Sequence, residues 1–189
     1  PYPGGNVYGA TKAFVGQLTA LSLLALHAAL ARGFIPEAEA NEWAAQLQGL
    51  PELMRKTLKL DAQIQAVAET LYTADRFLYI GRGVNYPTAL EGALKLKEIS
   101  YIHAEGFPAG EMKHGPLALI DQQTPVVAIA TQSDVFVKTL SNIEEAKARG
   151  ARLIALCTEG ERRLWGRTDH IIELPPVGDR LSPILNIIP

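Results

Sequence analysis

Three charged side chains lie three and four residues apart near the middle of the chain. Glu91, Lys95 and Glu98 share one face of any helix that spans them, whereas Lys97 points elsewhere. One interpretation is a solvated face on which the lysine pairs with the acids. The other is a partly buried cluster, a setting that adjusts a carboxylate to act as a general base. The spacing alone leaves both interpretations open.

Two histidines and two glutamates follow among glycines and prolines between residues 103 and 116. Their spacings match no familiar zinc pattern, so we expect no metal site. We expect a loop that presents His114 to a neighbouring site, because loops held by glycine and proline often carry function. The only cysteine, Cys157, lies in an apolar run and is expected to be a buried structural thiol.

A glycine-rich turn, Gly81-Arg82-Gly83, closes the strand predicted at 77–80, and a helix is predicted from Pro87. In an open α/β sheet, a helix N-terminus at such a place offers unpaired N–H groups to an anion. A tight turn between strand and helix needs glycine even without a ligand. Both explanations stay open.

The elements that must position these residues alternate between strand and helix. Further strands are predicted at 125–130, 152–157 and 170–174, with a helix at 134–149. This alternation predicts an α/β fold, a doubly wound three-layer parallel sheet over residues 75–189. Residues 1–74 are predicted to be a mostly helical segment. Its helices are expected at 12–32, 36–47 and 51–71, the last two opened by Pro36 and Pro51.

Charge and hydropathy limit the partners that this chain is expected to have. The 189 residues include 18 basic and 20 acidic side chains, a formal net charge of −2. This balance predicts binding to neither nucleic acid nor an anionic membrane. The longest apolar stretch, 18–31, is interrupted by Thr19, Ser22 and His27 and falls short of the ~20 residues of a membrane span. We expect no signal peptide and a cytoplasmic location.

A long run of the sequence resembles the second sugar isomerase (SIS) domain of the glutamine:fructose-6-phosphate aminotransferases, also called glucosamine-6-phosphate synthases. The resemblance is carried by Gly81-Arg82-Gly83 and by the segments 86–105 and 110–121, with support from 141–150 and 181–184. It implies that residues 12–32 are the closing helix of a first SIS domain and that linker helices follow. Residues 75–189 would then be a SIS domain shortened at its C-terminus.

The resemblance implies a reaction, in which fructose 6-phosphate and glutamine-derived ammonia give glucosamine 6-phosphate without a metal or an organic cofactor. By position, Glu98 matches the glutamate that moves a proton between the first two sugar carbons. Lys95 matches a lysine of the same active site, and Glu91 and Thr11 are expected to contact the substrate. His114 matches the histidine that opens the sugar ring from the adjacent subunit, which implies a homodimer.

Parts of that family's machinery are not found in these residues. The sequence shows no glutaminase cysteine at its start, no Ser-rich loop of the S-x-S-G-x-T kind and no tail with a Schiff-base lysine. We therefore expect this chain alone to be inactive. The alternatives are a non-catalytic module that binds phosphosugars and a SIS module whose role is dimerisation.

A second resemblance lies at the N-terminus, where residues 3–15 are similar to the active-site segment of short-chain dehydrogenases. Tyr8 and Lys12 have the Tyr-x-x-x-Lys spacing with which such enzymes lower the pKa of the tyrosine. The synthases usually have Ser-Thr-Lys-Ala-Phe here, and Ala10 stands in the serine's place. Only seven residues precede Tyr8, too few for a dinucleotide-binding unit, so a dehydrogenase fragment is a remote alternative.

Overall fold

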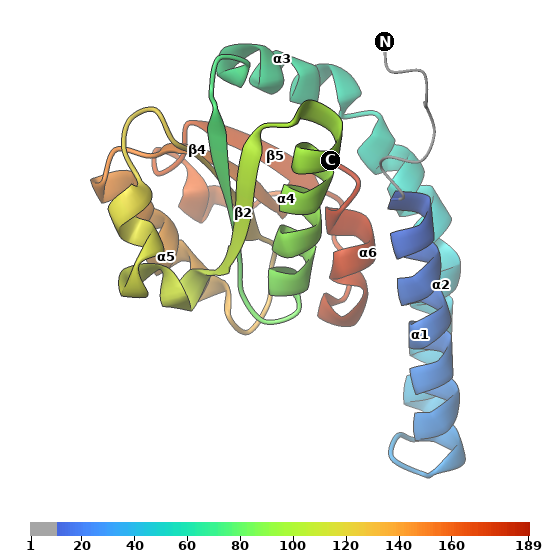
Figure 1. Ribbon diagram of the computed structural model, residues 1–189. Helices are drawn as coiled ribbons and strands as arrows, with labels where there is room; N and C mark the ends of the chain where they lie inside the picture. The colour runs from blue at the N-terminus through green and yellow to red at the C-terminus, as the bar shows by residue number, and fades with distance from the viewer. Residues whose placement is uncertain (1–10) are drawn as a thin grey trace.

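The computed structural model describes residues 11–189, in which three helices precede a five-stranded α/β body (Figure 1). The first three helices are α1 (Thr11–Ala31), α2 (Glu37–Leu58) and α3 (Asp61–Leu71). The body follows as β1 (Arg76–Gly81), α4 (Asn85–Ser100), β2 (His103–Pro108), β3 (Pro125–Ala130), α5 (Phe136–Ala148), β4 (Arg152–Thr158), β5 (His170–Leu174) and α6 (Ser182–Asn186). Short 3₁₀ turns lie in the connections, among them η1 (Ala109–His114) and η2 (Pro116–Leu119).

All strand pairs in the sheet are parallel, and the strand order is β2-β1-β3-β4-β5. The chain goes from β1 through α4 to β2 on one side, and then returns to β3 on the other side of β1. The direction of winding therefore reverses between β1 and β3, where ligands of such sheets usually bind. The predicted doubly wound α/β fold is confirmed.

The strand side chains alternate between two core clusters, one on each face of the sheet. On one face, Leu78 and Ile80 of β1 pack with Phe136 and Ile143 of α5. On the other face, Phe77 packs with buried residues of α3 and α4. This period of two gives the three layers of the body, with α5 opposite α3 and α4.

The strand β2 lies where the sequence predicted a loop, and that prediction was wrong for residues 103–108. Its residues pair in register with β1, from Arg76 opposite His103 to Gly81 opposite Pro108. As an edge strand it is only partly covered, so its sequence lacks the continuous apolar run of the other strands. The predicted loop begins after it, and His114 ends η1 within that connection.

The predicted helix boundary at Pro51 was also wrong, because α2 continues through this residue and ends at Leu58. Proline removes one helical hydrogen bond, but the neighbouring Leu50 is 4 % exposed and packs with Leu181 and Ile184. This packing holds both halves of the helix in one line. The break between α2 and α3 falls at Lys59 and Leu60 instead.

Helices α1 and α2 form a pair that stands beside the sheet and reaches it through α6 (Figure 1). Leu26 is the buried residue of α1, whereas Leu21 and Leu24 are largely exposed. Among residues 11–189, α1 alone is long and apolar enough to span a membrane by length and composition. The apolar stretch 18–31 was expected to be too short for a span, whereas the whole 21-residue helix meets the criterion. Helices that pack inside soluble proteins meet the same criterion.

The helix α4 lies unusually close to the strands, because glycine occupies the points of contact. A Cβ at Gly106 of β2 would lie 2.8 Å from Cα and 2.9 Å from N of Leu90 on α4. A Cβ at Gly92 of α4 would lie 3.1 Å from two ring carbons of Tyr79 on β1. The height of α4 above the sheet is therefore set by the two glycines.

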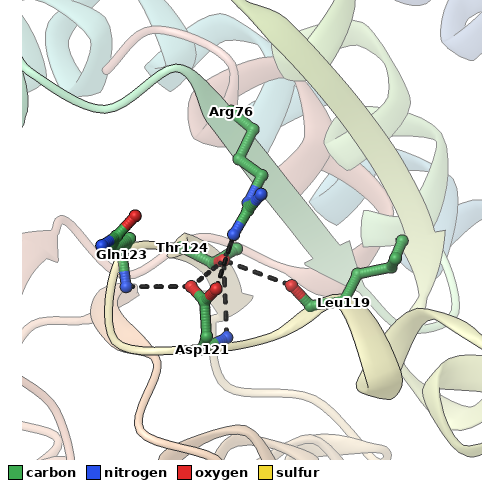
Figure 2. A network of polar contacts seen from close by, with 5 residues as sticks. All are labelled: Arg76, Leu119, Asp121, Gln123 and Thr124. Atoms are coloured by element: carbon green, nitrogen blue, oxygen red, sulfur yellow. Dashed lines mark hydrogen bonds and ion pairs between the residues drawn. The ribbon is translucent and has the colours of Figure 1, made fainter.

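A polar network ties the start of β1 to the loop that enters β3 (Figure 2). Arg76 donates to Asp121 Oδ2 at 2.6 Å and to Thr124 Oγ1 at 3.1 Å. Asp121 Oδ1 accepts from the Thr124 hydroxyl at 2.7 Å and from the backbone N–H of Gln123 at 2.9 Å. The bond from Thr124, followed by those from Gln123 and Arg76, holds the pKa of Asp121 below its usual value. The network fixes the position of this loop.

We expect Gly106→Ala to destabilise the fold by about 1–3 kcal/mol, because the new methyl group overlaps the backbone of Leu90 and lifts α4. Urea unfolding followed by circular dichroism measures the change. Gly49→Ala is the matched control, since nothing lies within 4 Å of its Cβ position in α2. The control should stabilise by up to about 1 kcal/mol. Equal stability of Gly106→Ala and wild type would contradict the close contact.

Candidate active site

The cluster predicted on one helix face forms on α4 and is partly buried. Lys95 Nζ lies 2.6 Å from Glu98 Oε2 and 3.3 Å from Glu91 Oε1. The side chains of Lys95, Glu91 and Glu98 are 16 %, 17 % and 33 % exposed. Of the two interpretations of this spacing, the structure therefore shows the partly buried cluster.

The charge of Lys95 is stabilised by its two neighbours. The hydrogen bond with Glu98 is the main cause that raises the pKa of Lys95, and Glu91 adds to it, against the opposing effect of desolvation. An ammonium group held in this way is suited to stabilise negative charge that develops on a nearby oxygen. Glu98, the more exposed of the two acids, is the better placed to exchange a proton with a ligand.

Lys95 also lines a largely apolar cavity of about 610 Å³ between α4, α3 and the sheet, here called the Lys95 cavity. Thr11, at the first turn of α1, lies in the same wall. The structure thus brings together two of the five predicted site residues at this cavity. Most other lining side chains are apolar, including Leu71, Phe77, Tyr79, Val127 and Ile154.

Two polar residues of the Lys95 cavity were not found from the sequence. Thr88 and Asn186 are buried, and their Oγ1 and Oδ1 atoms have no hydrogen-bond partner within residues 11–189. The spacing of seven residues from Thr88 to Lys95 places both on one face of α4 and could have indicated the threonine. Asn186 comes from α6, about ninety residues away along the chain, and no local pattern indicates it.

The crevice between the ends of β1 and β3 is filled by side chains of α6. Asn85 Nδ2 donates to Thr131 Oγ1 at 3.1 Å, and Asn85 Oδ1 accepts from Asn186 Nδ2 at 2.8 Å. Ser182 Oγ lies 3.5 Å from the same Asn85 oxygen. These buried bonds fasten α6 to the N-terminal end of α4.

The turn Gly81-Arg82-Gly83 is explained by steric needs. A Cβ at Gly81 would lie 2.2 Å from the backbone oxygen of Asn85, and Gly83 has a φ of +57°. The Arg82 guanidinium donates to Asn142 Oδ1 of α5 at 3.1 Å. The structure therefore explains the two glycines by the tight turn between β1 and α4, and it favours this explanation over an anion-binding site.

His114 and Cys157 do not line the Lys95 cavity. His114 is 74 % exposed at the end of η1, with Nε2 3.8 Å from Glu111 Oε2. No group of three His, Cys, Asp or Glu side chains in residues 11–189 is arranged to hold a metal ion. Cys157 is fully buried, as predicted, and burial raises the pKa of its thiol to about 12. Tyr8 of the dehydrogenase-like pair lies outside the described residues, and Lys12 is in α1.

The fold and the cluster define an α/β domain with a doubly wound parallel sheet and an acid–lysine–acid group on its first crossover helix. The SIS domain family model matches residues 70–189, and the chain belongs to this family. The match includes the sheet and the helix α4 that carries the cluster.

Its more specific relatives are isomerizing glutamine–fructose-6-phosphate aminotransferases, as the resemblance predicted. The chain is 49 % identical to that of Bacteroides thetaiotaomicron over 179 residues and 52 % identical to that of Gloeobacter violaceus over 183 residues. Each match covers 95 % of this chain and about 30 % of the relative. The C-terminal domain of glucosamine-fructose-6-phosphate aminotransferase from Francisella tularensis superposes with a TM-score of 0.91 and 38 % identity, over 95 % of this chain and 51 % of that one.

We expect Lys95→Met to lower the free energy of unfolding at pH 7 by about 1 kcal/mol, because two neighbouring acids lose their common cation. The pKa of Lys95 is raised in the folded state, so its contribution is complete below the ordinary value of 10.5 and is lost as the pH rises through the raised pKa. Urea unfolding at pH 7 and pH 9 should therefore give the same difference. Lys97→Met, at an exposed position of α4, is the control and should change stability by less than about 0.5 kcal/mol.

Proposed function

We propose that this chain is the isomerase part of an aminotransferase that converts fructose 6-phosphate and glutamine-derived ammonia to glucosamine 6-phosphate. The observation that carries the proposal is the position of Lys95, 2.6 Å from Glu98 and 3.3 Å from Glu91. The cluster lies in a chain about half identical to isomerizing aminotransferases along 95 % of its length. The chain spans about 30 % of those relatives, so we propose that it works as part of a longer protein and is inactive alone.

In the proposed reaction, Glu98 is the general base. Once ammonia has replaced the ketone oxygen at C2 as an imine, with loss of water, the Glu98 carboxylate takes a proton from C1 and returns it to C2. The C1 hydroxyl loses its proton and the imine nitrogen gains one, which leaves an aldehyde at C1 and an amine at C2. The Lys95 ammonium stabilises the negative charge on the oxygen of the enolamine between these steps. Glu91 holds Lys95 from the other side and, with Thr11, contacts the hydroxyl groups of the sugar. The short bond between Lys95 and Glu98 supports this division of roles.

We further propose that the working unit is a homodimer in which His114 acts in the partner's site. His114 ends the turn η1 with most of its side chain exposed, and it does not line the Lys95 cavity. A histidine in such a position is available to a second copy of the chain, where it opens the sugar ring by proton transfer. The site would then need residues from both subunits.

The helical segment fits the same proposal. Residues 1–74 would contribute the closing helix of a first SIS domain and the linker helices, and residues 75–189 the second SIS domain. The exposed apolar side chains of α1, Leu21, Leu23 and Leu24, support its packing in another domain rather than in a bilayer. With this role the protein would be a cytoplasmic metabolic enzyme that binds phosphosugars, and neither membranes nor nucleic acid.

We expect Glu98→Gln to lower the turnover of glucosamine 6-phosphate synthesis about 10²–10⁴-fold with little change in KM, because the amide cannot take the proton. The chain is grafted in place of the matching segment of the Gloeobacter violaceus relative, which is 52 % identical. Product formation and exchange of the C2 proton with deuterated water are measured. Glu52→Gln, at an exposed position of α2, is the control and should retain activity.

In the grafted enzyme, Glu98→Gln could instead weaken substrate binding and leave turnover unchanged. That result would favour the non-catalytic binding module. In the chain alone, isothermal titration with fructose 6-phosphate and glucosamine 6-phosphate addresses the same alternative. Binding of either sugar by wild type and Lys95→Met alike would place it outside the Lys95 cluster.

We expect activity to return when two inactive grafted variants, His114→Ala and Glu98→Gln, are expressed together. A mixed dimer has one site with both residues intact, because each subunit supplies what the other lacks. Random pairing makes half of the dimers mixed, and each has one of two sites intact, so about a quarter of wild-type turnover should return. No recovery above the single variants, with mixed dimers shown by mass spectrometry, would rule out a site shared between subunits.

A further inference from the structure

Two buried polar groups face the Lys95 cavity without a partner, although the rest of its wall is largely apolar. Thr88 of α4 is 1 % exposed and Asn186 of α6 is 3 % exposed, and both line the cavity. Their Oγ1 and Oδ1 atoms make no hydrogen bond within residues 11–189. A buried polar atom is costly unless something binds to it. The proton transfer proposed for Glu98 makes no use of either residue.

The hydroxyl of Thr88 behaves differently from those of other helical threonines in this chain. Thr19, Thr57 and Thr139 each donate to the backbone carbonyl four residues earlier, at 2.8, 3.0 and 3.1 Å. The equivalent bond of Thr88, to the carbonyl of Val84, is not made. Within residues 11–189, the Thr88 hydroxyl therefore keeps both its donor and its acceptor capacity for a ligand in the cavity.

The hydrogen bonds of Asn186 fix which end of its amide is left for a ligand. Nδ2 donates to Asn85 Oδ1 at 2.8 Å and to Thr131 Oγ1 at 3.1 Å, which uses both of its N–H groups. If the amide turned over, its oxygen would face the Asn85 oxygen, and two acceptors cannot bond to each other. The Asn186 oxygen is therefore an acceptor that needs a donor. Thr88 lies one helical turn beyond Asn85, so both unpaired atoms lie at the same end of the cavity.

The wall around this pair selects the kind of ligand. The cavity of about 610 Å³ has the size of a site for a small organic molecule, and Phe77 and Tyr79 contribute aromatic rings among aliphatic side chains. The charged residue of the wall, Lys95, is already paired with Glu91 and Glu98, so an anion would meet a net negative charge. An apolar wall with two polar atoms at one end fits a neutral ring that carries a single polar group.

We propose that the Lys95 cavity binds a neutral aromatic alcohol, a ligand of the phenol class, at Thr88 and Asn186. The ring packs against Phe77, Tyr79 and the apolar side chains of the strands. The hydroxyl donates to Asn186 Oδ1 and accepts from Thr88 Oγ1, so that one group satisfies both buried atoms. A hydrocarbon leaves both atoms unpaired, and a sugar sets several hydroxyl groups against apolar side chains. The site does not rest on the proposed function.

Titration calorimetry of the 189-residue chain with 4-methylphenol and toluene tests the proposal, because these molecules differ only by the hydroxyl group. We expect 4-methylphenol to bind with a Kd below about 1 mM and toluene about tenfold more weakly or worse. Thr88→Val keeps the shape of the side chain and should remove most of this preference. Thr139→Val is the matched control, since this threonine of α5 is equally buried but does not line the cavity. It should leave the preference unchanged.

A second measurement needs no variant. Intermolecular nuclear Overhauser effects should join the ring protons of 4-methylphenol to the methyl groups of Ile129, Ile154 and Leu156, which line the cavity. The proposal is overturned by no saturable response at 10 mM, about tenfold above the expected Kd, by contacts elsewhere on the chain, or by a preference that Thr88→Val leaves unchanged. Equal binding of toluene would also overturn it and would indicate an apolar cavity whose two polar atoms hold water. None of these results bears on the proton transfer proposed for Glu98.

Discussion

The contact of α4 with the strands beneath it is the constraint on which the site depends. A Cβ at Gly106 would overlap the backbone of Leu90, and a Cβ at Gly92 would press on the ring of Tyr79, so glycine lets the helix approach the sheet at both points. Because α4 lies close to the sheet, the face of α4 that carries Lys95 comes near the edge of the core. Lys95, which would be a solvated side chain on a higher helix, is therefore 16 % exposed and lines a cavity. The partial burial of Lys95, and with it the strength of its ion pairs, thus depends on the close approach of α4 to the strands.

The partly buried position explains why one lysine is placed between two acids. Glu91 or Glu98 alone would be poorly solvated there, and two acids without a cation would repel each other. Lys95 serves both, and the raised pKa shows that the acids in turn favour its charged form. The same arrangement suits proton transfer, because it places a carboxylate beside a cation that can stabilise developing negative charge. Structural and chemical requirements coincide at this cluster.

The sequence predicted those parts that local patterns determine. The strands β3 and β4 are apolar runs buried on both faces, and the spacing of Glu91, Lys95 and Glu98 needs only the geometry of a helix. The strand β2 was missed because an edge strand with His103 and Glu105 shows no apolar run. The continuation of α2 through Pro51 depends on packing with α6, more than a hundred residues later. Asn186 was missed for the same reason, since only its burial beside α4, with Oδ1 unpaired within residues 11–189, marks it.

The short helix α6 joins the two halves of the molecule. Its Ile184 packs with Leu50 of α2, while Asn186 donates to Asn85 at the first turn of α4. The helical pair and α4 are thus both fastened to one segment of five residues. The buried hydrogen bond between the Asn186 and Asn85 side chains is costly to break, because a buried amide group left without its partner would cost about 1–3 kcal/mol. Within residues 11–189, α6 therefore connects the packing of α1 and α2 with the N-terminal end of the helix that carries Lys95.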